Sequence, residues 1–191
     1  MDLITFSQKV LELKKIKRTG WVSRGTKNPE SVADHSFSLA ILAYIFSKKY
    51  GLNIEKCIKM ALVHDLCEIY SGDIPSKPFS DIKYEENKRK KEEEGLKKLL
   101  KFLPEEFREE IFSLWKEFED AKTKEARLVK DLDKLEMCLQ ALDYAKSEYK
   151  KELSEFFEDG KNNIRTKEIR EIFNKIYVQF KEVSKEKQHD I

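Results

Sequence analysis

The sequence predicts an all-α fold, on the basis of three observations. Of the 191 residues, 40% are apolar and 39% are charged, whereas only six are glycine and four are proline. This balance is typical of long amphipathic helices, each with a buried apolar stripe and a charged outer surface. Leu, Ile, Val and Phe recur at helical spacing, and no alternating apolar and polar run is long enough to indicate a strand. A chain of this length fills one hydrophobic core or, at most, two small ones, so we expect a single helical bundle.

The first two helices expected are separated by an irregular loop. The first covers residues 3–16, and the stretch 18–35, with two glycines, one proline and several turn-forming residues, predicts the loop. The second helix begins near residues 31–33 and runs to about Tyr50, because Gly51 follows. Its side chains expected to be buried are Phe37, Ala40, Ile41, Tyr44 and Ile45.

The middle of the chain predicts three further helices. Asn53 can cap the first of them, which continues until the segment SGDIPSKP breaks it with one glycine and two prolines. The buried side of this helix carries Ile58, Ala61, Leu62, Leu66 and Ile69. A charged helix is expected from about residue 80 to residue 102, and Pro104 suits the first turn of another that extends to about residue 120.

The last part of the chain predicts one long helix and two shorter ones. Residues 123–147 have a strongly amphipathic pattern whose buried side carries Leu128, Leu132, Leu135, Leu139 and Leu142. The shorter helices are expected at about residues 149–158 and 166–184, and the C-terminal SKEKQHDI is expected to fray.

Composition and charge exclude several classes of function. A total of 38 basic and 36 acidic residues gives a formal net charge of only +2, with the two signs interleaved. We therefore expect no nucleic-acid partner, although a small anionic substrate at a local site is compatible with this pattern. The three cysteines are far apart and include no CxxC pair, which indicates small buried residues rather than disulfides. The sequence has neither a signal-peptide pattern nor the roughly 18 consecutive apolar residues of a membrane span, so we expect a cytoplasmic protein without a membrane partner.

Two of the three histidines, His35 and His64, lie beside an aspartate within apolar helices. Imidazole and carboxylate are the usual ligands of Zn, Mn, Co and Fe ions. A satisfied core histidine beside a capping aspartate would explain either pair alone. In ALVHDLCEIYSGDIP, however, His64 and Glu68 share a helix face, and Asp65 lies one step around it. Asp73 then follows on a tight loop, and a divalent cation is the simplest compensation for so many polar groups in an apolar helix.

Three segments resemble the HD-domain superfamily of metal-dependent phosphohydrolases, namely RTGWVSRGTKNPESVADHS, ALVHDLCEIYSGDIPS and VKDLDKLEM. They are most similar to its 5'-deoxynucleotidase branch. The HD pair alone is not specific, whereas the combination of ESVADHS, HDLCE, GDIP and LDKLEM is far more so. The resemblance implies a single HD-domain helical bundle over residues 1–191, with a core at about 3–147 and a C-terminal helical extension at about 148–184.

Carried over by position, the resemblance implies the metal ligands His35, His64, Asp65 and Asp133. The ion would be Mn, Co or another transition metal, and Mg is also compatible. Helical geometry alone does not separate Asp131 from Asp133, because both flank the same leucine stripe, and a solvated helix residue is the competing interpretation of either. The choice of Asp133 rests on the resemblance.

The resemblance also places Glu68 and Asp73 beside the ion as catalytic residues. Glu68 would orient the attacking water or accept its proton. Asp73 and the Ile74 backbone would lie close to the nucleotide, together with Pro75 and Ser76, or would hold a second, weaker ion with Glu68. The competing interpretations are an exposed helix partner for Glu68 and a turn-forming residue for Asp73.

Arg18 and Trp21 are the predicted substrate contacts in the loop before the first ligand. A guanidinium suits phosphate oxygens, and an indole offers a face to a sugar or base. Relatives in the family place an arginine and a tryptophan here, adjacent in some members, whereas Thr19 and Gly20 intervene in this chain. Arg24 is therefore a rival for the phosphate contact, and a plug on the helical core is the competing interpretation of Trp21.

The function implied by the resemblance is metal-dependent hydrolysis of 2'-deoxynucleoside 5'-monophosphates to deoxynucleoside and phosphate. The deoxyribose preference comes from the resemblance alone. The alternatives are an HD-type phosphohydrolase acting on another nucleotide, such as a triphosphate or an alarmone, and a catalytically inactive helical interaction module. Pairing as a homodimer is also expected from the family, with the helices after residue 80 as one available surface.

Overall fold

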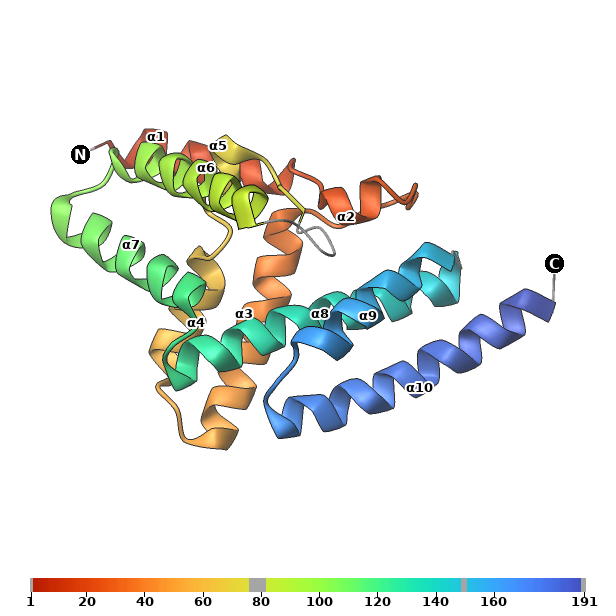
Figure 1. Ribbon diagram of the computed structural model, residues 1–191. Coiled ribbons are helices and arrows are strands. Elements are labelled where there is room, and N and C mark those ends of the chain that lie inside the picture. Colours follow the sequence, from red (N-terminus) through yellow and green to blue (C-terminus); the bar gives the residue numbers. More distant parts are fainter. Residues whose placement is uncertain (1, 76–81, 149–150, 190–191) are drawn as a thin grey trace.

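The computed structural model describes residues 2–75, 82–148 and 151–189. Over these ranges the chain is helical and contains no strand, apart from one isolated antiparallel bridge between Lys17 and Ser31, so the predicted all-α class is confirmed (Figure 1). The α-helices are α1 (Leu3–Val10), α2 (Thr19–Val22), α3 (Val32–Tyr50), α4 (Ile54–Val63), α5 (Glu68–Ser71), α6 (Ile82–Leu100), α7 (Glu105–Asp120), α8 (Lys124–Ser147), α9 (Ser154–Asn163) and α10 (Lys167–His189). Short 3₁₀ helices cover Leu11–Lys14 and Lys151–Leu153.

Local capping determines both ends of α3. The Ser31 hydroxyl oxygen accepts a hydrogen bond from the Asp34 N–H, and the Asp34 carboxylate accepts one from the Ser31 N–H, which together form a capping box. Gly51 ends the helix with φ of 65°, in the left-handed region that favours glycine. The Asn53 side chain then caps α4 by accepting a hydrogen bond from the Lys56 N–H. The predicted ends of α3 and the predicted start of α4 are confirmed.

The buried face of α3 differs from the prediction. Of the five side chains expected inside, only Ala40 is buried, and Phe37 is 66% exposed. The face that packs against α4 and α8 carries mostly small or polar side chains, namely Val32, His35, Ser36, Leu39, Ala40, Ala43 and Ser47. Small residues allow these helices to approach closely, which leaves the larger apolar side chains outside. The resulting exposed stripe, called the α3 stripe below, consists of Phe37, Ile41, Tyr44 and Ile45.

The helix expected after Asn53 is interrupted at the candidate site. α4 ends at Val63, and α5 begins only at Glu68. In the turn between them, the backbone N–H groups of Leu66 and Glu68 donate to carbonyl oxygens three residues back, at 3.2 and 3.1 Å. This tighter spacing replaces regular α-helical spacing, so His64 and Glu68 are not related by one continuous helix face as predicted. Leu62, also expected to be buried, is 47% exposed.

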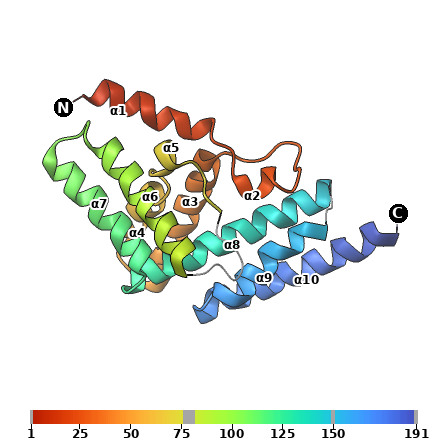
Figure 2. The same cartoon turned by 45° about the horizontal axis from the view of Figure 1, so that its top comes forward.

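Two hydrophobic clusters form the interior. The larger cluster joins α3, α4, α8, α9 and α10, and the smaller one joins the N-terminal segment, the α4–α5 turn, α6 and α7. On α3, Val32 belongs to the smaller cluster and Leu39 to the larger one. On either side of His64, Ala61 belongs to the larger cluster and Leu66 to the smaller one. The two candidate histidines therefore lie where the clusters meet. Figures 1 and 2 show α8 passing beside α3, with α9 and α10 along α8 on the side away from α1.

The C-terminal helices pack directly on α8. Phe157 of α9 and Phe180 of α10 stack with ring centroids 4.1 Å apart inside the larger cluster. α9 begins and ends later than the predicted 149–158, of which residues 149 and 150 lie outside the described part of the chain. Gly160 lies within this helix, where its backbone closely approaches α8 and α10. α10 continues to His189, so residues 184–189 of the segment that was predicted to fray are helical, whereas the last two residues lie outside the described part.

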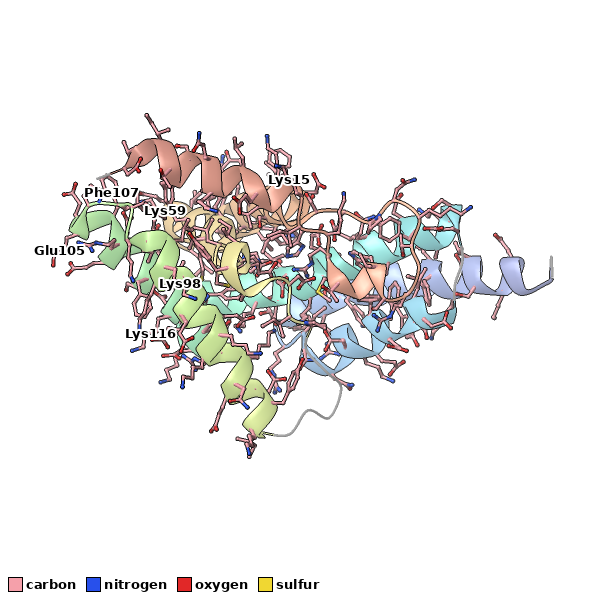
Figure 3. The ribbon with its side chains drawn as sticks, turned by 90° about the horizontal axis from the view of Figure 1, so that it is seen from above. Lys15, Lys59, Lys98, Glu105, Phe107 and Lys116 are labelled. Atoms are coloured by element: carbon pink, nitrogen blue, oxygen red, sulfur yellow. The ribbon has the colours of Figure 1, made fainter. Side chains whose placement is uncertain are left out.

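Charged side chains of both signs lie on the surface, as the composition predicts. Figure 3 shows Lys98 of α6 and Glu105 and Lys116 of α7, all exposed, on neighbouring helices.

Leu139 of α8, expected to be buried, is 38% exposed. Within the described part of the chain, no helix is long and apolar enough to span a membrane. Cys57, Cys67 and Cys138 are all free and buried, as their spacing in the sequence predicted.

Candidate metal centre

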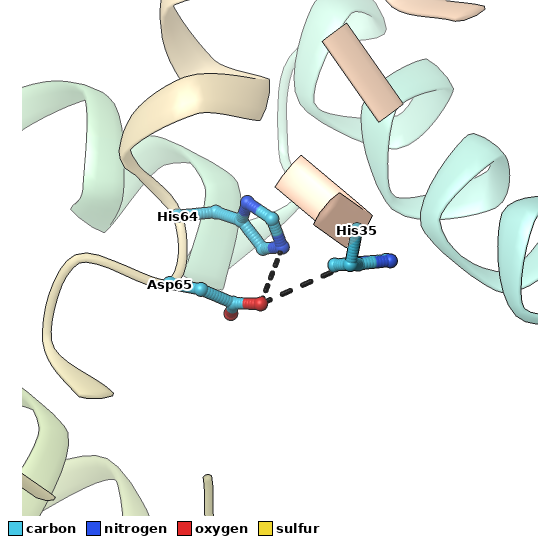
Figure 4. Close-up of side chains that lie close together, drawn as sticks. All are labelled: His35, His64 and Asp65. Atoms are coloured by element: carbon cyan, nitrogen blue, oxygen red, sulfur yellow. Dashed lines mark ion pairs between the residues drawn. The ribbon is translucent and has the colours of Figure 1, made fainter. Parts of the chain in front are cut away.

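Three of the predicted ligands meet in the interior. His35 comes from α3, and His64 and Asp65 come from the turn after α4 (Figure 4). The Asp65 Oδ2 atom lies 3.0 Å from His64 Nε2 and 3.9 Å from His35 Nε2. The candidate ligand atoms of the three residues lie within 4.8 Å of one another. Both imidazoles are buried, so the cluster is largely shielded from solvent.

The fourth predicted ligand, Asp133, reaches the same point from α8. Its Oδ1 atom lies 3.1 Å from His35 Nε2. Asp131, two residues earlier, has a different role. Its carboxylate accepts hydrogen bonds from the backbone N–H groups of Arg165 and Thr166, at 3.2 and 2.6 Å, just before α10 begins. The structure thus separates the two aspartates that the helical pattern left equivalent, and it brings Asp133 to the histidines.

Several buried atoms of this cluster make no hydrogen bond of acceptable geometry within the described part of the chain, although a carboxylate oxygen lies 3.0 or 3.1 Å from each imidazole nitrogen. They are His35 Nε2, His64 Nε2 and Glu68 Oε2. An unsatisfied buried polar atom costs about 1–3 kcal/mol. Two unpartnered imidazole nitrogens beside two carboxylates form the donor set that divalent transition metals prefer. The residues present therefore fit a divalent cation.

Hydrogen bonds at the far side of each imidazole orient its ring. His64 Nδ1 lies 2.8 Å from the backbone oxygen of Ala61. His35 Nδ1 lies 2.6 Å from Oε2 of Glu136, a buried residue of α8. In both cases Nε2 is the nitrogen that faces the centre of the cluster. Glu136 was not predicted from the sequence, although it lies in the segment VKDLDKLEM, because an acidic residue on an amphipathic helix usually faces solvent.

The electrostatics of the cluster favour ionised carboxylates and a positive charge between them. Burial by itself would raise the pKa of Asp65, but His64 and Arg18 hold it below its ordinary value. Burial likewise opposes ionisation of Asp133, but His35 holds the pKa of that carboxyl well below its ordinary range. Burial and the Arg18 charge disfavour protonation of His35, but two neighbouring carboxylates outweigh them and raise its pKa to about 10. A cation can replace this proton, because the same carboxylates balance either charge.

Glu68 is buried beside the cluster, on the first turn of α5. Burial raises the pKa of its carboxyl well above the ordinary value, and the charges of Asp65 and Asp73 raise it further. Its position excludes the competing interpretation of an exposed helix residue. A buried carboxyl with a raised pKa next to a cation site is suited to accept or hold a proton.

The structure distinguishes the two candidate arginines. Arg18 Nη1 donates a hydrogen bond of 3.0 Å to Asp65 Oδ2, so its guanidinium lies at the cluster. Arg24 lies elsewhere, where it bonds to the Gly20 carbonyl oxygen and pairs with Glu155 of α9. Arg18 is therefore the arginine positioned to meet an anion at this site.

The loop after α5 is tied to the start of α2. The Asp73 carboxylate accepts a hydrogen bond from the Thr19 N–H, and the Asp73 carbonyl oxygen accepts one of 2.8 Å from the Thr19 hydroxyl. Ile74 is half-buried and Pro75 is exposed, whereas the predicted contact Ser76 lies outside the described residues. Among the described residues, Asp73 does not join a group of candidate ligand atoms within 4.8 Å of one another, so the second ion stays a prediction.

Trp21 is placed differently from its predicted role as a substrate contact. It is 1% exposed, and its ring packs on Phe156 with centroids 3.9 Å apart. Its indole N–H donates a 2.8 Å hydrogen bond to Glu30 Oε1. A side chain enclosed in this way has no open face for a sugar or base. The structure supports the competing interpretation, in which Trp21 is a plug on the helical core.

Comparisons with known proteins match most of the chain. A sequence model of the HD domain matches residues 10–177. The chain is 39% identical over 176 residues to the Homo sapiens protein 5'-deoxynucleotidase HDDC2, covering 92% of this chain and 84% of that protein. It is 45% identical over 158 residues to the protein of the same name from Dictyostelium discoideum, covering 77% and 82%, respectively.

The fold is also similar to that of a solved structure, the PH0347 protein from Pyrococcus horikoshii OT3. The two share 34% sequence identity with a TM-score of 0.75, over 92% of this chain and 99% of the other. The family match extends to residue 177, well into α10.

Proposed function

The chain belongs to the HD-domain family, and from this premise we propose that it is a metal-dependent 5'-deoxynucleotidase. The reaction is hydrolysis of a 2'-deoxynucleoside 5'-monophosphate to the deoxynucleoside and phosphate. The observation that carries the proposal is the convergence of four side chains from three distant segments, with Arg18 beside them. Relatives at 39% and 45% identity that bear the name 5'-deoxynucleotidase support the choice of reaction.

The cation would be held by His35, His64, Asp65 and Asp133. When bound, a divalent ion supplies positive charge at a phosphate oxygen and makes water more acidic. The two imidazoles offer Nε2, and the two carboxylates balance the charge of the ion. Because all four side chains come from packed helices or from the turn between two of them, the ligands need little rearrangement to bind.

Arg18 and Glu68 supply the remaining functions. The planar fork of the Arg18 guanidinium suits two oxygens of a phosphate, and its position beside Asp65 directs it to the same phosphate as the cation. Glu68 would accept the proton of the attacking water at Oε2, since a nearby cation favours the carboxylate form of a carboxyl whose pKa is otherwise raised. The attack is in line with the departing 5'-oxygen.

The test is release of inorganic phosphate from dAMP, dGMP, dCMP and TMP by the purified protein with added Co²⁺ or Mn²⁺. We expect turnover of at least one of them and slower turnover of the matching ribonucleotide. Absence of turnover with all four, in protein shown to hold the metal, would contradict the proposal. Turnover of a triphosphate or an alarmone instead would identify the alternative HD-type phosphohydrolase, and absence of both turnover and metal would favour the inactive interaction module.

We also infer that the ion is Mn²⁺, Co²⁺ or another divalent transition metal, with Mg²⁺ also compatible, that the chain forms a homodimer and that it acts in the cytoplasm. The donor set of two imidazoles and two carboxylates supports a transition metal. The exposed α3 stripe supports self-association, because contiguous exposed apolar patches often mark interaction sites. Light scattering during size-exclusion chromatography tests the dimer, and a monomer at micromolar concentration would contradict it.

A further inference from the structure

Glu136 is a buried acidic residue for which the proposed reaction has no direct use. It is 4% exposed, and its Oε2 atom lies 2.6 Å from Nδ1 of His35. A buried carboxylate without compensation is costly, so its partner is part of the reason for its place in the interior. The partner here is a predicted ligand of the cation. The contact of Glu136 with the candidate metal centre thus runs through His35.

The spacing of Glu136 and Asp133 places both nitrogens of His35 against α8. The two acidic residues are three positions apart and share one face of the helix. The Asp133 Oδ1 atom is 3.1 Å from Nε2, and the Glu136 Oε2 atom is 2.6 Å from Nδ1. A single helix turn thus determines the orientation of this imidazole. His64 differs, because its Nδ1 faces the neutral backbone oxygen of Ala61.

Glu30 lies next to both His35 and Glu136. The candidate ligand atoms of Glu30, His35 and Glu136 lie within 4.8 Å of one another, and all three residues are buried. Glu30 is held by three separate hydrogen bonds: Oε1 accepts from the Trp21 indole, the backbone N–H donates to the Tyr144 hydroxyl, and the backbone oxygen accepts from the Arg18 N–H. The loop that carries Arg18 is therefore packed against the residues behind the candidate metal centre.

We propose that Glu136 is a positioning residue for the metal centre. Its carboxylate accepts the Nδ1 hydrogen of His35, which determines the tautomer whose Nε2 is available to the cation. A carboxylate acceptor also makes the imidazole a stronger ligand than a neutral acceptor does. Glu30 lies beside Glu136 and is itself held by the Trp21 indole N–H. This inference rests on the proposed metal centre, but it does not depend on which nucleotide is hydrolysed.

The test compares Glu136→Gln with a matched control on the same helix. Purified full-length protein, stripped of metal, is titrated with Co²⁺, and the visible absorption of the bound ion reports affinity and ligand geometry. We expect Glu136→Gln to weaken Co²⁺ binding by about 10- to 100-fold and to change the spectrum, as loss of an outer carboxylate does at other metal–histidine sites. Glu136→Asp, which keeps the charge, should bind Co²⁺ more tightly than Glu136→Gln.

The control is Asp131→Asn, which changes another buried carboxylate of α8. Asp131 bonds to the backbone before α10 and not to a candidate ligand, so this variant should lose stability while its Co²⁺ affinity and spectrum remain those of the wild type. Wild-type Co²⁺ affinity in Glu136→Gln would overturn the proposal, and so would equal weakening in Asp131→Asn. If the wild type binds Co²⁺ and Glu136→Gln weakens binding, but no deoxynucleotide is hydrolysed, the proposed function fails and this inference stands.

Discussion

Glu92 gives a prediction whose magnitude and pH dependence follow from its position. It lies on α6 and is 9% exposed, and its one ion pair within the described part of the chain is with Lys88, whose Nζ atom is 3.6 Å from Glu92 Oε1. Burial raises the pKa of Glu92 from 4.5 to about 7; Lys88 partly opposes this effect, while Glu119 and Asp65 add to it. The folded protein therefore holds this proton more tightly than the unfolded chain does.

The sign of the pH effect follows from that difference. The contribution of the protonated carboxyl to stability is fully present below the unfolded pKa, near 4.5, and is lost as pH rises through the folded pKa of about 7. At 1.36 kcal/mol for each pH unit between the two values, the loss is about 3 kcal/mol. Glutamine has a similar shape and carries no charge at any pH. Glu92→Gln should therefore be more stable relative to the wild type at pH 8 than at pH 5, by about 2–3 kcal/mol.

Urea unfolding followed by circular dichroism measures this difference in metal-free protein at both pH values. The matched control is Glu93→Gln, the next residue on α6, whose side chain is 37% exposed and pairs with Lys97. We expect the difference between the control and the wild type to change by less than about 0.5 kcal/mol between the two pH values. If the difference in unfolding free energy between Glu92→Gln and the wild type is equal at pH 5 and pH 8, the reasoning from burial is refuted.

Three further substitutions test other parts of the structure. Trp21→Phe removes the indole N–H whose hydrogen bond Glu30 accepts, so it should lower the free energy of unfolding by about 2–4 kcal/mol. The KM for deoxynucleotide should stay within about threefold of the wild-type value. A tenfold higher KM at unchanged stability would show a substrate contact instead. Asp133→Asn should weaken Co²⁺ binding by more than about 100-fold in a spectroscopic titration, whereas Asp131→Asn should not, and equal losses would contradict the assignment. Gly160→Ala should lower the free energy of unfolding by about 1–2 kcal/mol in thermal or urea unfolding. The reason is that the added Cβ would lie 2.8 Å from a cysteine sulfur of α8 and 2.9 Å from a phenylalanine ring of α10. Unchanged stability would show that the three helices are not closely packed there.

The ends of α3 were predictable from sequence because they depend on neighbouring residues. Ser31 and Asp34 form a capping box with each other, and Gly51 adopts a positive φ that most residues avoid. Such interactions need no information about distant parts of the chain. The interruption after Val63 was not predicted, since the segment through Ile69 keeps an apolar pattern and contains neither glycine nor proline.

The buried face of α3 could not be deduced in the same way. The helix has apolar residues on more than one face, so the spacing of large side chains does not identify the inside. The inside is determined by how closely α4 and α8 approach, and close approach favours small residues such as Ala43 and Ser47. Phe37, with its large side chain, is left exposed for the same reason.

At the candidate site, the sequence indicated residue types and their order, but not which neighbours they meet. The family motifs led to His35, His64 and Asp65, which the structure brings together. Glu136 was missed because a buried glutamate and an exposed one look alike in an amphipathic pattern. Trp21 was assigned to the substrate because the resembling family places a tryptophan there and an indole offers a face to a sugar or base, whereas its burial depends on contacts with distant helices.

We infer that one divalent cation is held between α3, the turn after α4 and α8. Anomalous diffraction from crystals grown with Co²⁺ tests it most directly. We expect a single strong peak within about 2.5 Å of a ligand atom from each of four side chains, namely His35, His64, Asp65 and Asp133. A peak on the opposite side of His35, between its Nδ1 and Glu136, would contradict this metal site, and so would crystals without an ordered ion.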